Sequence, residues 1–145
     1  MPLFYLLLAL MFSLGVMSQV EKTSKNRGMA VAEVKAVSVS MLIYRNLVAT
    51  YASANPAQTG SVSDASLSMP NWYVKNPGFG NFLTPGGSYV FYTQQLPGLV
   101  GELAKRTEST NLGVNRNGVL IAPNKVNSGI VLPAQIPNGS VVLVQ

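Results

Sequence analysis

The sequence predicts an α+β protein: an N-terminal transmembrane helix, then a long amphipathic helix packed on a small, mostly antiparallel sheet with one further short helix. Three observations lead to this fold class. The first twenty residues carry no charged side chain, the next segment has apolar residues at helical spacing, and the second half alternates short apolar runs with turn signals. We expect residues 1–20 to form the membrane anchor, 21–28 a polar collar, and 29–145 a single α+β domain.

The N-terminal segment "MPLFYLLLALMFSLGVMSQV" is apolar apart from Ser13, Ser18 and Gln19. A bilayer core about 30 Å thick needs roughly twenty helical residues, and Leu3–Val20 is nearly that long. Two interpretations compete. A cleavable signal peptide would be cut before Gln19, after the small residues Val16 and Ser18, but no basic residue precedes the apolar run. We therefore favour an uncleaved anchor.

The stretch "EKTSKNRG", residues 21–28, forms the collar. Its basic residues are Lys22, Lys25 and Arg27. Because they follow the apolar run, the positive-inside rule would leave the next domain in the cytoplasm, and Glu21 scarcely offsets this. Gly28 is expected to break the helix, so that the collar ends one helix before another begins.

The segment "MAVAEVKAVSVSMLIYRNLVATYASA" predicts a helix that Asn55-Pro56 stops. Apolar residues recur in one stripe at spacings of three and four, namely Val34, Val37, Met41, Tyr44, Val48 and Tyr51. A second stripe of Val39, Ile43 and Leu47 is expected to widen the apolar face. A sheet from the same chain would cover that face most simply, and a partner helix is the alternative.

A Ser-, Ala- and Gly-rich stretch, "PAQTGSVSDASLSMP", predicts a surface loop. Beyond it, "NWYVKNPGFGNFLTPGGSYVFYTQQ" predicts strands near Trp72–Lys75 and Ser88–Thr93. The glycines and prolines of "GFGNFLTPGG" are expected to shape turns, since no GK[ST] and no helix follow as a phosphate-binding loop would require.

The segment "LPGLVGELAKRT" predicts a short helix. Leu99, Val100 and Leu103 would face inward, and Lys105 and Arg106 suit its C-terminal end, where the helix dipole is negative.

The rest of the chain predicts short strands. An Asn117-Gly118 turn is expected between two of them, because Asn-Gly favours a tight hairpin. A second Asn-Gly turn precedes the final apolar strand, Val141–Val144.

Missing residue types narrow the chemistry. The chain has no cysteine and no histidine, which removes disulfides, thiolate zinc sites and the commonest general base. Five carboxylates exist, and nothing in their spacing suggests the convergent pair of a hydrolase. We expect no enzyme, no catalytic, cofactor-binding or metal-binding residue, no cofactor and no small-molecule substrate.

The charge pattern also argues against nucleic acid. Ten basic and five acidic residues give a net charge of +5, but the basic residues are scattered rather than gathered in a stripe with aromatics. The candidate partner-docking residues are the aromatics Trp72, Tyr73, Phe79 and Phe82. Packing in the core or at a sheet edge is the alternative for them.

The C-terminal half carries a family resemblance. "GELAKRTESTNLGVNRNGVLIAP" followed by "LPAQIPNGSVVLVQ", after an apolar N-terminus in a chain of this length, resembles the PilM family of plasmid-encoded type IVb thin pili, encoded beside conjugative pilus genes. The longer, nucleotide-binding, actin-like proteins that share the name in type IVa systems are a different family. No residue carries over as a catalytic or binding set.

The resemblance implies an accessory inner-membrane protein of the pilus basal body. It would act as a scaffold in pilin transport or pilus assembly for conjugation, with other pilus-assembly proteins as partners and residues 1–20 in the membrane. The resemblance places the domain in the periplasm, which conflicts with the basic collar.

Two alternatives stay open. A minor pilin or pseudopilin also joins an apolar N-terminal helix to a small α+β head. Against it, the apolar segment begins at Leu3 without a basic leader ending in glycine, cutting after Gly15 would leave few residues before Glu21, and the collar would interrupt the helix. A secreted enzyme or small-ligand binder is the third reading, and a mature N-terminus at Gln19 would support it.

Overall fold

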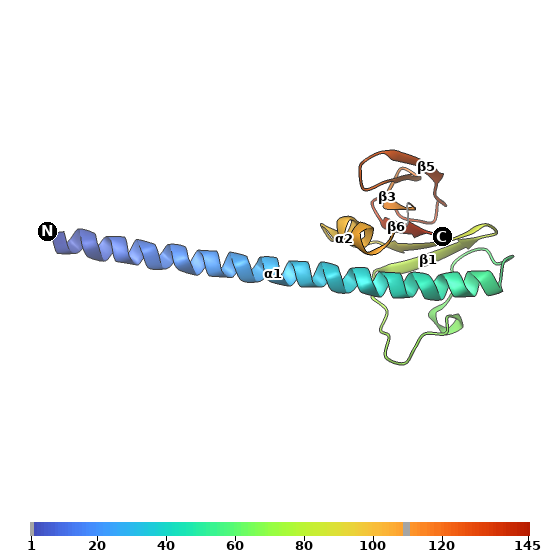
Figure 1. Ribbon diagram of the computed structural model, residues 1–145, viewed down its shortest axis with the longest axis horizontal. Coiled ribbons are helices and arrows are strands. Elements are labelled where there is room, and N and C mark those ends of the chain that lie inside the picture. The colour runs from blue at the N-terminus through green and yellow to red at the C-terminus, as the bar shows by residue number, and fades with distance from the viewer. Residues whose placement is uncertain (1, 109–110) are drawn as a thin grey trace. The chain divides into compact units, whose positions relative to one another are not determined.

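The computed structural model describes residues 2–108 and 111–145, with only the backbone of residues 2–4 and 6–21. It is an α+β fold with a long helix and a six-stranded antiparallel sheet (Figure 1). The helices are α1 (Pro2–Ala54), α2 (Leu99–Arg106) and the 3-10 turn η1 (Asp64–Ser66). The strands are β1 (Phe79–Thr84), β2 (Gly87–Tyr92), β3 (Leu112–Arg116), β4 (Val119–Ile121), β5 (Asn127–Val131) and β6 (Val141–Val144). The chain divides into two compact units, Met1–Glu33 and Val34–Gln145.

The first unit is helical, and its helix does not stop at the collar. The expected break at Gly28 is wrong, because α1 continues through residues 21–28 to Ala54. A glycine costs a helix only about 1 kcal/mol relative to alanine. The collar holds no proline that would remove a backbone donor, and Glu, Lys and Arg are good helix formers. The predicted end before Asn55-Pro56 is confirmed.

Where side chains are described, no helix is long and apolar enough to cross a membrane. The predicted anchor falls on residues 1–20, and all of these side chains except that of Tyr5 lie outside the described residues. The anchor, the collar and the domain boundaries therefore stay predictions.

The sheet of the second unit has the strand order β1-β2-β6-β3-β4-β5, with every neighbouring pair antiparallel. The C-terminal strand β6 lies between β2 and β3 and so joins the β1-β2 hairpin to the rest of the sheet. In its register, Val90 pairs with Leu143 and Leu143 with Leu112. This row of buried residues faces α1 and α2.

The core between α1 and the sheet contains the predicted helical stripe. Val37, Met41, Tyr44 and Val48 are buried against the strands and against α2, which confirms that stripe. The second stripe does not simply widen the same face, because Val39 is 42% exposed. At 100° per residue, Val39 lies about 200° from Val37 around the helix, so the two residues point in opposite directions.

A second, smaller core covers the other face of the sheet. Its buried residues are Phe91, Leu120, Leu132, Ile136 and Val142. Asn115 bonds to both Asn-Gly turns. Its Oδ1 accepts from the Gly118 N–H at 2.9 Å, and its backbone carbonyl accepts from the Gly139 N–H at 2.8 Å. Asn117 and Gly118 have φ of 52° and 83°, as the predicted hairpin turn requires.

The remaining strand predictions are mixed. The strand near Ser88–Thr93, the short helix and the final strand Val141–Val144 are confirmed as β2, α2 and β6. The strand at Trp72–Lys75 is wrong, because this stretch is irregular, and β1 begins at Phe79, inside "GFGNFLTPGG". Aromatic and β-branched residues favour strands only where a neighbouring strand can pair with them.

Candidate interaction surface

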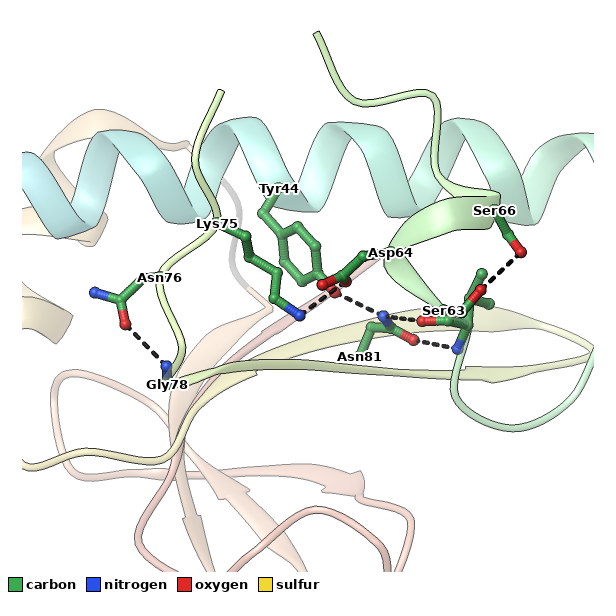
Figure 2. Close-up of polar contacts among 9 residues, drawn as sticks. Tyr44, Ser63, Asp64, Ser66, Lys75, Asn76, Gly78 and Asn81 are labelled. Atoms are coloured by element: carbon green, nitrogen blue, oxygen red, sulfur yellow. Dashed lines mark hydrogen bonds and ion pairs between the residues drawn. The ribbon is translucent and has the colours of Figure 1, made fainter. Parts of the chain in front are cut away.

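A buried amide joins three segments of the second unit (Figure 2). Asn81 on β1 is only 5% exposed. Its Oδ1 accepts from the Val62 N–H at 2.7 Å, while its Nδ2 donates to the Val62 carbonyl at 2.9 Å and to the Tyr44 hydroxyl at 2.7 Å. The side chain therefore pairs with Val62 much as a strand would. It ties residues 61–78, named here the crossover loop, to β1 and to α1.

Lys75 closes the crossover loop beside Tyr44. Its Nζ lies 2.8 Å from the Asp64 carboxylate and 5.4 Å from the centre of the Tyr44 ring. Both members of the ion pair are partly exposed, so the pair contributes at most about 1 kcal/mol. Its effect is to hold the two ends of the loop together across α1, as Figure 2 shows.

Burial raises the pKa of the Tyr44 hydroxyl, although the Asn81 hydrogen bond and the nearby Lys75 charge act in the opposite direction. The phenol therefore stays protonated at neutral pH and is a poor general base. Among the residues that the structure describes, no three carboxylates gather into a metal site. The contacts among Tyr44, Asn81, Asp64 and Lys75 therefore hold the crossover loop against α1 and β1.

A groove of about 450 Å³ lies between α1 and the crossover loop. Its lining residues are Lys35, Ala36, Val39, Ser40 and Ile43 of α1 with Trp72, Tyr73 and Val74 of the loop. We call it the Trp72 groove. Figure 1 shows the loop passing α1 on the side away from the sheet. Trp72 is 71% and Val74 84% exposed, so large apolar groups stand in solvent here.

Tyr73 fixes the shape of the Trp72 groove. Its hydroxyl donates to the Ser40 carbonyl at 2.9 Å and accepts from the Ser40 hydroxyl at 3.2 Å. Burial raises the pKa of the Tyr73 hydroxyl. The Trp72 ring meets the Tyr73 ring edge to face, with centroids 6.1 Å apart. The exposed tryptophan thus stands on a loop that is bonded to the helix.

The four aromatics named as docking candidates do not form one patch. Trp72 and Tyr73 lie together in the groove. Phe79 is 4% exposed and packs against Tyr44 and Tyr92 in the larger core. Phe82 packs on the other face of the sheet, against the smaller core.

Six of the eight residues that line the groove were not among the docking candidates: Lys35, Ala36, Val39, Ser40, Ile43 and Val74. The signal for Val39 was present, because its angle on the helical wheel separates it from the buried stripe. Nothing in the sequence indicated that the crossover loop would return to α1 beside it.

These features define a small α+β protein with an exposed apolar groove and, in its described part, no metal cluster. A family model described as PilM matches residues 8–144, and the chain belongs to the PilM family. The resemblance to the PilM family is thereby confirmed, while the plasmid-encoded, conjugative setting stays a prediction. Membership indicates a role in pilus biogenesis.

Two solved structures are similar to the chain. A PilM protein from Pseudomonas aeruginosa 2192 is 36% identical, with a TM-score of 0.51, over 77% of this chain and 95% of that one. A PilM protein from Escherichia coli B7A is 24% identical, with a TM-score of 0.62, over 79% of this chain and 93% of that one; it shows the fold alone. No curated protein matches the chain.

Proposed function

We propose that this protein is an accessory inner-membrane component of type IV thin pilus biogenesis that acts as a scaffold in pilin transport or pilus assembly for conjugation. The observation that carries the proposal is the PilM family match over residues 8–144. The groove supports it, since exposed apolar groups on a fixed loop are typical of a protein–protein contact.

The proposed mechanism is tethering. Residues 1–20 hold the protein in the inner membrane, and the second unit works in the periplasm. There it brings other pilus-assembly proteins together without chemical change. The crossover loop presents the contact surface, and the Asn81 network keeps the loop in place.

Deletion of the gene in its own host tests the proposal. Surface pili are counted by electron microscopy, and prepilin processing is followed by immunoblot on the same cells. The scaffold proposal expects pili to vanish while pilin is still processed and kept in the membrane. Pili of normal number and length would overturn it.

One observation favours a second candidate, a minor pilin or pseudopilin. α1 is continuous through the collar, so the interruption that counted against a pilin does not exist. Pili sheared from cells that carry an epitope-tagged protein separate the two candidates. A scaffold stays with the membrane, whereas a minor pilin co-purifies with the filaments.

A further inference from the structure

We infer that the Trp72 groove binds a short amphipathic helix of another protein, whose apolar side chains are flanked by carboxylates. The inference deepens the proposed function, because a scaffold needs a docking site. It rests on that function for the assumption that the partner is another pilus-assembly protein. It adds the chemistry of the partner segment.

The shape of the groove selects a helix. One wall is α1 from Lys35 to Ile43, which at 1.5 Å per residue runs for about 12 Å, or roughly two helical turns. None of the lining residues belongs to a β-strand, so an extended peptide finds no strand edge to pair with. A volume of about 450 Å³ admits a few apolar side chains from one face of a helix.

The surface chemistry of the groove suits such an anchor. Trp72, Val74 and Val39 are all exposed, and tryptophan is among the residues that most often dominate binding energy at interfaces. Because Tyr73 and Ser40 already hold the loop on the helix, a partner need not order it. A preformed site of this kind loses less conformational entropy on binding.

Charge decides between possible occupants. Lys35 is an exposed cation on the groove wall, and none of the described carboxylates pairs with it. Among the described side chains no carboxylate lines the groove, and the whole chain carries +5. A second copy would therefore bring the same basic surface, whereas an acidic helix is attracted.

The test uses the full chain kept in solution by an uncharged amphipol. Trp72 is the only tryptophan, so its fluorescence reports on the groove directly. Two synthetic tryptophan-free helical peptides share one leucine face, and glutamates flank that face in one and lysines in the other. We expect the glutamate peptide to shift Trp72 emission to the blue and to saturate, and the lysine peptide to bind at least roughly threefold more weakly.

Three variants localise the effect. Val39→Asp, on the groove wall, should weaken the glutamate peptide at least about tenfold, since a charge then faces the leucines. Val131→Asp is the matched control, because Val131 is 75% exposed on β5 and outside the groove, and it should change nothing. Lys35→Glu should reverse the preference toward the lysine peptide.

Other outcomes overturn the inference. A blue shift with anionic phosphatidylglycerol vesicles but with neither peptide would make the groove a membrane-binding surface. A shift that grows with protein concentration alone would make it a self-association site. Equal binding of both peptides would show that charge does not select the partner. Equal loss of affinity in Val39→Asp and Val131→Asp would show that the peptide does not bind in the groove.

The same variants separate this inference from the proposed function. If the peptides behave as expected but cells without the gene make normal pili, the groove stands and the pilus role fails. If the deletion abolishes pili but Val39→Asp restores them as well as the wild-type gene does, the role stands and the groove is not its docking site.

Discussion

The two sides of α1 within the second unit differ in a way that the residue types do not show. Met41, on the side facing the sheet, is fully buried, whereas Val39, two positions earlier, is 42% exposed beside the crossover loop. One side is closed by strands whose backbone groups are paired, and the other by an irregular loop fastened at a few points. We therefore expect the closed side to carry most of the stability of the unit, whereas the open side leaves apolar side chains in solvent.

The largest expected effect comes from the closed side. Met41→Ala should lower the free energy of unfolding by about 2–5 kcal/mol, because it leaves a cavity among residues that cannot collapse far. Val39→Ala should change it by less than about 0.5 kcal/mol. Urea denaturation followed by circular dichroism compares them. Similar losses in both variants would show that the two sides are not different.

Asn81 gives the next effect, because it supports the open side from within the core. Asn81→Ala leaves the Val62 N–H and carbonyl without their buried partner. The free energy of unfolding should therefore fall by about 1–3 kcal/mol. Hydrogen exchange should rise over residues 61–78 and stay unchanged in β3 and β6. Uniform loss of protection across the sheet would instead make Asn81 a general core residue.

The pH dependence sharpens the comparison, since one tyrosine, Tyr44, is buried in the core and another, Tyr73, is partly buried on the crossover loop beside the groove. Burial raises the pKa of Tyr44 and of Tyr73 above the ordinary value of 10.0. The folded protein then holds these protons more tightly than the unfolded chain. The stability that this supplies is complete below pH 10 and is lost as the pH rises through the folded-state values.

Thermal unfolding between pH 8 and pH 11 measures this. We expect the melting temperature of the wild-type protein to fall above pH 10. The melting temperature of Tyr44→Phe should fall less steeply, because the ring remains and the titrating hydroxyl is gone. Tyr51→Phe, on the same helix, serves as the control. If the melting temperature of Tyr44→Phe depends on pH as steeply as that of the wild type, Tyr44 is not the cause of the loss of stability.

How much of this was predictable from the sequence depends on which interactions decide each element. The Met41 stripe, α2, the Asn117-Gly118 turn and β6 follow local patterns of period, capping and turn residues, and these predictions are confirmed. The pairing of Asn81 with Val62 spans distant residues and has no sequence signature.

The errors have physical reasons of the same kind. Gly28 was expected to stop a helix, but α1 continues through it. The free-energy cost of a single glycine is small enough for the good helix formers around it to offset. Trp72–Lys75 has the composition of a strand and lacks a partner strand, so its aromatics became the loop side of the groove. The groove itself exists only because the crossover loop returns to α1, which no local pattern records.

The smallest expected effect is the one that tests whether the open side is preformed. Tyr73→Phe keeps the ring and removes the hydroxyl that bonds the Ser40 carbonyl, so global stability should fall by about 0.5–1.5 kcal/mol. The local consequence should be larger than this figure suggests, since Trp72 then stands on a loop held to α1 by fewer bonds. Fluorescence anisotropy of Trp72 should drop. The glutamate peptide should bind more weakly, although the groove lining has lost only a hydroxyl that is already bonded to Ser40. Ser63→Ala, which removes an exposed loop hydrogen bond to Ser66 away from the groove, is the control.

If Tyr73→Phe leaves both anisotropy and affinity at their original values, the loop is held by packing alone. The hydroxyl pair between Tyr73 and Ser40 would then be a consequence of the groove's shape rather than its cause.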